Sequence, residues 1–166
     1  MILVDDVESP IGTVRFAVHD GKICALGFED HWPSLEKEVR RRLGPLELGR
    51  ADDPEGFSAR LRDYFRGNLA AIDAIPVDPT GTPFQLRVWS GLREIPCGTT
   101  LSYGELACRI GKPESVRAVG AANGANPISI IVPCHRVIGA NGDLTGYGGG
   151  LSRKRWLLVH EKVLLT

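Results

Sequence analysis

A cysteine directly before a histidine, Cys134-His135, is the pair in this sequence best suited to covalent chemistry. A free thiol has a pKa of about 8.5 and is mostly protonated at neutral pH, whereas the thiolate is the nucleophile. An imidazole that takes the proton would activate the sulfur. Adjacent side chains diverge on a strand and on a helix, so we expect a water or another group to bridge the two.

Glu161 is the carboxylate that could orient this histidine. It follows two leucines by three and four positions in the predicted last helix, so it shares a face with apolar side chains. A buried carboxylate needs a partner, and a catalytic histidine needs an acceptor at its second nitrogen. The residues therefore predict a relay from Glu161 through His135 and a water to Cys134. The alternative is a surface pair of Glu161 with Arg155, with Lys162 or with a helix end.

The first half of the chain has the pattern of a scaffold built from strands and helices. Apolar residues alternate in three short runs, and Asp20-Gly21 between the last two is a hairpin signal. Apolar residues further along recur at helical spacing. We expect strands over 2–7, 13–18 and 22–28, a helix over 34–43, a loop over 44–54, and a second helix that starts near Phe57 and ends at Gly67-Asn68.

Two helix-start signals open the second half of the chain. Thr82-Pro83-Phe84-Gln85 and Ser102-Tyr103-Gly104-Glu105 are capping boxes, in which the first and last residues satisfy each other's backbone amides. The second box predicts a short helix to about residue 110, and Pro113 begins another that reaches about Asn123. Two short helices joined by a glycine-containing turn form a helix-turn-helix pattern.

The second of these two helices is rich in small residues. Ala118 and its neighbours would let a DNA backbone or groove wall approach closely, with Arg117 projecting among them. Tight helix packing, with Arg117 as a solvated surface charge, explains the same residues. This segment alone leaves DNA contact and helix packing open.

The nucleophile pair lies between a β-branched run and a glycine-rich segment. Residues 128–132 predict a buried strand that leads into Pro133 and Cys134. Gly146-Tyr147-Gly148-Gly149-Gly150 permits a tightly folded loop whose amides can approach a flat ligand. Arg153-Lys154-Arg155 opens the predicted last helix, either as a phosphate-binding cluster or as a solvated helix face.

The formal net charge of the 166 residues is zero, but the charge is unevenly distributed. Residues 1–79 carry ten Lys and Arg against fifteen Asp and Glu, whereas residues 80–166 carry ten against five. With the turn-rich segment 76–81 between them, we predict two domains, a scaffold over 1–79 and a chemical domain over 80–166. A basic second domain indicates a polyanionic partner, with chance scatter of surface charge as the alternative.

The composition also narrows the class of protein. No apolar run approaches the roughly 20 residues of a membrane span, and the first residues lack a signal-peptide pattern. The four cysteines lie far apart without a C-x-x-C pair, and His19, Cys24 and His31 match no common metal-ligand spacing. We therefore expect a cytoplasmic chain with no membrane contact, no metal and no cofactor.

The stretch from Thr82 to Glu161 resembles the C-terminal domain of the O6-alkylguanine-DNA alkyltransferases. The order and spacing of short motifs support this resemblance over about half of the chain, and the first half is compatible with the more variable domain of that family. The resemblance implies an α+β fold, with a small N-terminal antiparallel sheet plus helices and a mostly helical C-terminal domain with a helix-turn-helix. The shared motifs are Thr82-Pro83-Phe84-Gln85, Val88-Trp89, Ile95-Pro96, Ser102-Tyr103-Gly104-Glu105-Leu106-Ala107, Arg117-Ala118-Val119-Gly120, Asn126-Pro127, Pro133-Cys134-His135-Arg136-Val137 and Gly146-Tyr147-x-Gly149-Gly150.

The implied function is direct-reversal DNA repair. A methyl or other alkyl group would move irreversibly from O6-alkylguanine, and also from O4-alkylthymine, to Cys134. The product is a thioether, which water does not readily cleave, so each chain would act once. The implied partner is double-stranded DNA containing O6-alkylguanine, contacted in the minor groove with the damaged base flipped out. A monomer would bind it, and cooperative assembly on DNA is left open.

The resemblance also implies a role for each matching residue. Cys134 would accept the alkyl group, His135 would be its water-mediated base, and Glu161 would orient the histidine. Asn126 would brace the turn that carries the nucleophile, and Tyr103 would donate a proton to the departing base. Val137 and the Cys134 carbonyl would read the exocyclic amine, and Tyr147 and Gly148 would form walls of the pocket. Arg117 would fill the space of the flipped nucleotide, and further DNA contacts would come from Ala118, Ser102, Arg136 and Lys154. Gly148 stands where some relatives have serine, so only its backbone amide is available to the base.

Two other functions fit parts of the same pattern. The Cys-His-Glu set would also suit a hydrolase or acyltransferase acting on an ester or amide, although such an enzyme needs an oxyanion hole that the sequence does not identify. The third hypothesis is a non-catalytic helix-turn-helix binder of alkyl damage in which Cys134 is structural. A pure binder has no use for a thiol in its pocket, which favours the transferase.

Overall fold

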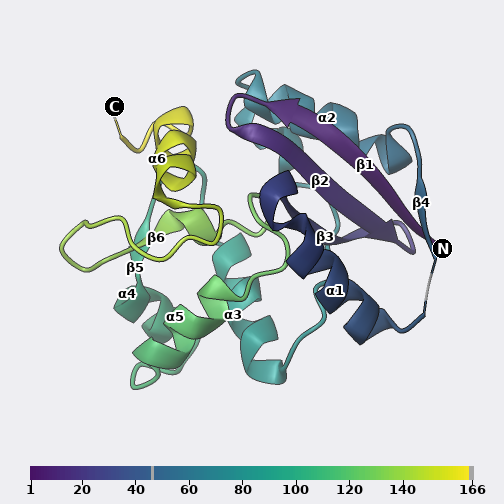
Figure 1. The fold of residues 1–166 in the computed structure, drawn as a ribbon. Helices are drawn as coiled ribbons and strands as arrows, with labels where there is room; N and C mark the ends of the chain where they lie inside the picture. The colour runs from purple at the N-terminus through teal and green to yellow at the C-terminus, as the bar shows by residue number, and fades with distance from the viewer. Residues whose placement is uncertain (46, 165–166) are drawn as a thin grey trace. The chain divides into compact units, whose positions relative to one another are not determined.

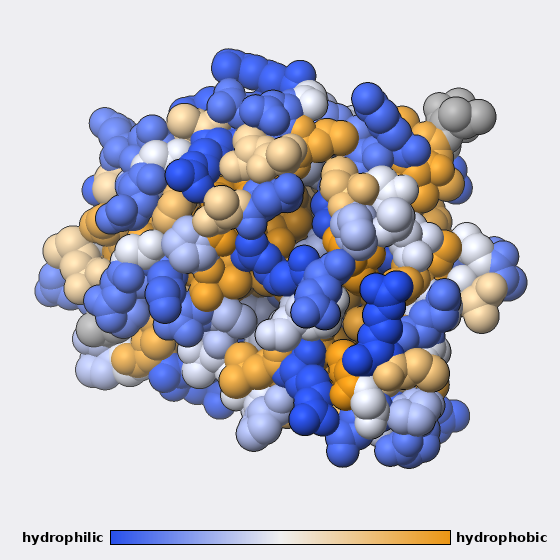
Figure 2. Space-filling model, turned by 180° about the vertical axis from the view of Figure 1, so that it is seen from behind, coloured by the Kyte–Doolittle hydropathy of each residue, from blue (hydrophilic) through white to orange (hydrophobic). Residues whose placement is uncertain are grey.

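The structure is a computed structural model that describes residues 1–45 and 47–164 of the chain. Leu46, inside the loop predicted over 44–54, and the last two residues of the second predicted domain lie outside the described residues. None of the helices in the described ranges is long and apolar enough to cross a membrane. On the face of the molecule in Figure 2, hydrophobic side chains are interspersed with hydrophilic ones.

The chain divides into two compact units, and the first, Met1–Thr80, is a four-stranded sheet with two helices (Figure 1). The first three strands form an antiparallel meander and the short fourth strand pairs in parallel with the first, which gives the order β3-β2-β1-β4. The elements are β1 (Ile2–Ser9), β2 (Gly12–His19), β3 (Lys22–Phe28), η1 (Glu29–His31), α1 (Trp32–Leu43), β4 (Leu48–Arg50), η2 (Pro54–Gly56), α2 (Phe57–Phe65) and η3 (Leu69–Ile72).

Helices α1 and α2 lie on opposite faces of this sheet. Alternate side chains of a strand point to opposite faces. Val4 of β1 belongs to a buried apolar cluster with Trp32 of α1, whereas the next residue, Asp5, accepts a hydrogen bond of 2.5 Å from the hydroxyl of Ser58 in α2. The sheet is therefore covered on both sides.

The predictions for the first unit are confirmed except for the loop. The three predicted strands and both predicted helices are present, with ends shifted by a few residues. The loop over 44–54 is wrong because Leu48–Arg50 forms β4. The backbone amide of Ile2 donates to Glu47, and that of Ala51 donates to Val4, so β1 pairs on its second edge as well.

The second unit, Gly81–Thr166, is mostly helical. Helices α3, α4 and α5 pack against one another, and the indole N–H of Trp89 in α3 donates to the carbonyl of Ala122 in α5 at 2.8 Å. Two-residue strands β5 and β6 pair in parallel. The elements are α3 (Pro83–Arg93), β5 (Leu101–Ser102), α4 (Tyr103–Arg109), α5 (Val116–Gly124), η4 (Cys134–Arg136), β6 (Val137–Ile138) and α6 (Leu151–His160).

Helices α4 and α5 form the predicted helix-turn-helix. Both capping boxes are present, at the start of α3 and of α4. Gly111 ends α4 with a φ of 77°, a conformation that glycine adopts without strain. Helix α5 starts at Val116 rather than at Pro113, because the amide of Ser115 closes a turn onto the carbonyl of Lys112.

Candidate active site

A tight turn, not a strand, leads into the candidate nucleophile. The predicted strand over 128–132 is wrong, because Ile130 has a φ of 72° and the amide of Val132 bonds back to the carbonyl of Ile128 at 3.0 Å. A β-branched residue in the left-handed region is strained and needs surrounding contacts to hold it. Asn126 supplies several of them, since its Nδ2 donates to the carbonyl of Val132 at 2.8 Å and its Oδ1 accepts the amide of Ile128 at 3.0 Å.

The 3-10 turn η4 then presents three consecutive buried side chains. Cys134 is 6% exposed, His135 is fully buried, and Arg136 is 6% exposed. Consecutive residues of a 3-10 turn are separated by about 120° around its axis. The imidazole and the sulfur therefore diverge, as the sequence predicts for a water-bridged pair.

Glu161, at the C-terminal end of α6, joins the two residues that follow the cysteine. The Nε2 of His135 lies 2.9 Å from Glu161 Oε2. The Nε and Nη2 of Arg136 donate to the two carboxylate oxygens at 2.8 Å and 3.0 Å. Glu161 is 1% exposed, which contradicts the alternative that it pairs at the surface.

Arg136 is therefore a structural partner of the site. Besides its two bonds to Glu161, its Nη1 donates to the carbonyl of Ile95 at 2.8 Å. The prediction that Arg136 contacts DNA is contradicted, because the guanidinium is buried and directed inward. Its charge serves instead to hold the carboxylate beside His135.

The ionisation states of Glu161 and His135 decide which nitrogen of the imidazole can act as the base. Burial alone would raise the pKa of Glu161, but the bonds and charges of His135 and Arg136 outweigh it and hold that pKa well below its usual range. Burial lowers the pKa of His135, against the opposing effect of Glu161. At neutral pH an ionised carboxylate thus faces a neutral imidazole, so Nε2 carries the hydrogen and Nδ1 is an acceptor. Nδ1 is buried without a hydrogen-bond partner among the described residues.

The sulfur of Cys134 is protonated in this resting site. Burial raises the pKa of the thiol, while a hydrogen bond to Asn126 and the charge of Lys154 act in the opposite direction. A protonated thiol is a poor nucleophile. The site therefore requires a base, and the free nitrogen of His135 is on the neighbouring residue.

Lys154 lies inside the unit rather than at its surface. Its side chain is fully buried, and its Nζ donates to the carbonyls of Val137 and Thr145 at 2.6 Å each. Burial lowers its pKa to about 8, although Cys134 raises it. The prediction that Lys154 binds DNA phosphate is contradicted. The ammonium instead joins β6 to the segment that precedes the glycines.

The other predicted pocket residues border this segment. The hydroxyl of Tyr103 lies 3.3 Å from the carbonyl oxygen of Thr145. Val137 and Tyr147 are buried, and burial raises the pKa of Tyr147 well above its ordinary value, whereas Gly148 is exposed. Tyr103 and Lys154 thus meet at one carbonyl at the start of the glycine-rich loop.

Three predicted DNA-contacting residues lie outside this cluster. Arg117 and Ala118 are exposed on α5. Ser102 is half-buried, and its hydroxyl accepts the amide of Glu105 at 3.1 Å as the cap of α4. Arg117 and Ala118 are accessible to a partner, and Ser102 has a structural role of its own.

One residue at the site escaped the sequence analysis. Asn123 of α5 is 2% exposed, and its Nδ2 donates to the carbonyl of Cys134 at 3.4 Å. It follows the buried Val119 by four positions, so it is a polar residue on a buried helix face. Like Glu161, it is a polar residue whose spacing places it among buried apolar side chains, and that spacing is visible in the sequence.

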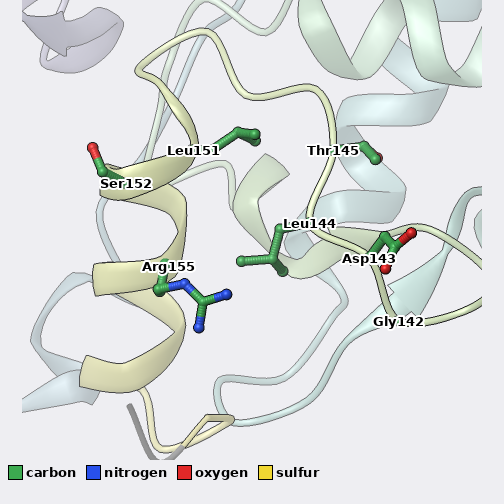
Figure 3. A pocket seen from close by; sticks show the side chains of 7 residues that line it. All are labelled: Gly142, Asp143, Leu144, Thr145, Leu151, Ser152 and Arg155. Carbon is green, nitrogen blue, oxygen red and sulfur yellow. The ribbon is translucent and has the colours of Figure 1, made fainter.

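An open pocket of about 550 Å³ lies beside the glycine-rich loop, and Cys134 is not among the residues that line it. Figure 3 shows Leu144 from the loop and Arg155 from α6 pointing toward one another across it. Of its lining residues, Arg155 belongs to the basic cluster that the sequence suggests as a candidate for phosphate binding. The pocket is lined by Gly142, Asp143, Leu144, Thr145, Leu151, Ser152 and Arg155.

The remaining cysteines have different surroundings. Cys24 is buried in the first unit, where burial raises its pKa to about 11. Cys108 is exposed and Cys97 is half-buried. Within the described ranges no group of three or more His, Cys, Asp or Glu residues could hold a metal ion. Cys134, next to a histidine–carboxylate pair, is the cysteine with a base at hand.

Comparison with known proteins assigns both units to one family. Residues 5–79 match the family described as 6-O-methylguanine DNA methyltransferase, ribonuclease-like domain. Residues 83–163 match 6-O-methylguanine DNA methyltransferase, DNA binding domain. Together the two matches cover most of the chain.

Individual relatives agree over nearly the whole length. The chain is 61% identical to the methylated-DNA–protein-cysteine methyltransferase of Shigella flexneri, with 99% of this chain and 98% of the relative covered. The crystal structure of the Mycobacterium tuberculosis O6-methylguanine methyltransferase is 43% identical, with a TM-score of 0.82 over 98% of this chain and 93% of that one. That of Mycobacterium tuberculosis OGT in complex with DNA is 41% identical, with a TM-score of 0.81 over 97% and 94%. The predicted resemblance and α+β fold are confirmed, and the chain belongs to the 6-O-methylguanine DNA methyltransferase family, the methylated-DNA–protein-cysteine methyltransferases.

Proposed function

We propose that Cys134 is the cysteine to which this chain transfers the methyl group of O6-methylguanine in DNA. The observation that supports this most directly is the buried pair of His135 and Glu161 at 2.9 Å, next to a thiol that burial keeps protonated. Such a pair supplies a base of fixed orientation and a charge that stabilises its protonated form.

The first step removes the proton of the thiol. The S–H bond of Cys134 breaks, the sulfur keeps the electron pair, and the proton passes through a bridging water to Nδ1 of His135. The imidazolium that forms lies against the ionised Glu161, whose charge favours the protonated ring. Arg136 keeps that carboxylate ionised and in place.

The second step transfers the methyl group. The thiolate attacks the methyl carbon, the new S–C bond forms as the C–O6 bond breaks, and the electron pair of that bond moves onto the guanine. The hydroxyl of Tyr103 donates a proton to the departing base and makes it a better leaving group. Cys134 is left as a thioether, so the chain is used once.

The substrate reaches the thiol as a flipped base of double-stranded DNA, because O6 is inaccessible in stacked duplex. A relative of 41% identity, Mycobacterium tuberculosis OGT, has been crystallised in complex with DNA. In this chain Arg117 and Ala118 are exposed on α5. We assign Arg117 to the space that the flipped nucleotide leaves, with small residues of α5 against the minor groove. A single copy of the chain suffices for this arrangement.

Peptide mass mapping tests the assignment of Cys134. After incubation with a duplex oligonucleotide containing O6-methylguanine, we expect a gain of one methyl group on the Cys134 peptide. Cys134→Ser abolishes the gain, and the exposed control Cys108→Ser keeps it. Methylation of another cysteine would contradict the assignment. Continuous release of product would point to a hydrolase, and binding without modification to a damage binder.

A substrate comparison tests the assignment of Arg117. We expect Arg117→Ala to slow the reaction with duplex DNA by about tenfold or more, because extrusion of the base loses its support. The reaction with free O6-methylguanine stays near the rate of the unmodified chain. Arg87→Ala removes an exposed charge from α3 and is the control. An equal loss on both substrates would refute the intercalation role.

A further inference from the structure

Asn123 bonds a buried side-chain amide to the backbone of Cys134. It is 2% exposed on α5, and the bond of 2.8 Å from the Trp89 indole to the carbonyl of Ala122 anchors this part of the helix. Its Nδ2 donates to the carbonyl of Cys134 at 3.4 Å. Its Oδ1 is buried and has no hydrogen-bond partner in the part of the chain that the structure describes. The Nδ2 of the amide is therefore hydrogen-bonded, whereas its Oδ1 can still accept a hydrogen bond.

A second available acceptor belongs to the next residue along the chain. His135 bonds to Glu161 through Nε2, which leaves Nδ1 as an acceptor, and no described residue donates to it. Both acceptors thus belong to residues joined to Cys134, Asn123 through its bond to the Cys134 carbonyl and His135 through the peptide bond. Buried acceptors without donors are costly and are rare in folded proteins. A water molecule offers two hydrogens, one for each acceptor, and its oxygen can accept the hydrogen of the thiol.

We propose that Asn123 is a positioning residue whose Oδ1 accepts the second hydrogen of the water that links Cys134 to His135, while its Nδ2 holds the Cys134 carbonyl. The inference rests on the proposed function, since it needs Cys134 to be the methyl acceptor. The S–H bond breaks and the sulfur keeps its electron pair. The water takes the thiol hydrogen and releases its own hydrogen on the histidine side to Nδ1. The hydrogen on the Asn123 side stays where it is, so the water cannot turn away.

The pH dependence of the transfer step distinguishes this role from a merely structural one. In Asn123→Leu the water loses one acceptor and the thiol loses its proton less readily. We expect the single-turnover rate at saturating duplex oligonucleotide to fall about three- to tenfold at neutral pH. The deficit shrinks as the pH rises, because the thiol then ionises without the relay. The oligonucleotide concentration at half-maximal rate stays unchanged.

Asn123→Asp gives the opposite trend and keeps the test usable if the leucine variant does not fold. A protonated aspartic acid reproduces the asparagine pattern, with a hydroxyl that donates to the Cys134 carbonyl and a carbonyl that accepts from the water. This variant therefore reacts at nearly the unmodified rate at acidic pH. Once ionised, its carboxylate opposes the neighbouring thiolate, so its deficit grows as the pH rises. The absorbance of the Cys134 thiolate, with the Cys134→Ser spectrum subtracted, should change with pH in each variant in the same way as the transfer rate.

Val119→Ala is the matched control, because it disturbs the packing of α5 one turn earlier without touching the amide. It changes the rate by one constant factor across the pH range. If both Asn123 variants also change the rate by a constant factor, or if Asn123→Leu reacts at the unmodified rate, the positioning role is wrong. Mass mapping separates this failure from failure of the proposed function, since Cys134 would still be methylated in the unmodified chain.

Discussion

The two units of the chain bury different kinds of side chain. Among the described residues, one buried polar side chain, Ser58, belongs to Met1–Thr80, whereas five belong to Gly81–Thr166. In the first unit the charged pairs stay partly solvated, as in the pair of Asp6 and Arg15, whose side chains are 28% and 18% exposed. The five of the second unit are Asn123, His135, Arg136, Lys154 and Glu161.

This difference separates folding from chemistry. Burial of a charge costs free energy that its partners only partly return, and the first unit largely avoids that cost. The second unit accepts it where the charges act, since all five residues lie in the elements around Cys134. Perturbed ionisable groups cluster in the same way at functional sites of other proteins. The contrast supports our proposal that Gly81–Thr166 contains the reactive centre and that Met1–Thr80 is its scaffold.

Removal of Glu161 gives the largest effect expected from this comparison. Glu161→Ala leaves Arg136 and His135 buried without their carboxylate, so we expect the free energy of unfolding to fall by about 3–5 kcal/mol. This loss is measured by denaturant unfolding, followed by tryptophan fluorescence, in a chain that also carries Trp32→Phe. The two tryptophans that remain, Trp89 and Trp156, both lie in Gly81–Thr166.

The matching substitution in the first unit is Asp6→Ala. Asp6 pairs with Arg15 at 2.7 Å and with Arg50 at 3.0 Å, but these groups are partly exposed. A solvated pair contributes about 0–1 kcal/mol, so the loss should stay within that range when unfolding is followed by Trp32 fluorescence in a chain with Trp89→Phe and Trp156→Phe. Equal losses for the two substitutions would contradict the contrast between the units.

The buried ammonium of Lys154 predicts a dependence of stability on pH. Its folded pKa is lowered to about 8, whereas that of an unfolded lysine is about 10.4. At neutral pH both states hold the proton. Between the two values the unfolded state binds more protons, so stability rises with pH. Relative to Lys154→Met, the free energy of unfolding should increase by up to about 1.4 kcal/mol per pH unit. A flat difference would mean that the ammonium is solvated, and a falling one that a partner raises its pKa in the folded chain.

Local signals explain which parts of the fold could be predicted. Alternating apolar runs, the Asp20-Gly21 turn and the two capping boxes each depend on a few neighbouring residues, and all are present. Strand β4 has no such signal, because three residues pair with β1 across a long separation in sequence. The run 128–132 has the composition of a strand, but the side chain of Asn126 bonds to its backbone and folds it into a turn.

The candidate site was predictable where a residue type conflicted with its position. Glu161 on an apolar helix face requires a partner, and the structure places it at His135. Lys154 lies on that same face, seven residues earlier, yet its place in a basic run suggested the surface. The carbonyls of Val137 and Thr145 that receive it come from other segments. The position of Lys154 on the buried helix face was therefore a better guide to its environment than the charges of its neighbours in the sequence.

The smallest expected effect concerns how helices start in the two units. In the first unit, α1 and α2 start without a side-chain cap within the described residues, whereas α4 starts with Ser102 in a capping box. Ser102→Ala should lower the stability of the second unit by about 1 kcal/mol. The methyl-transfer rate at saturating DNA should not change if the hydroxyl acts only as a cap. The exposed Ser152 of α6 provides the control Ser152→Ala, with an effect within about 0.5 kcal/mol. A slower reaction with unchanged stability would instead support the predicted contact of Ser102 with DNA.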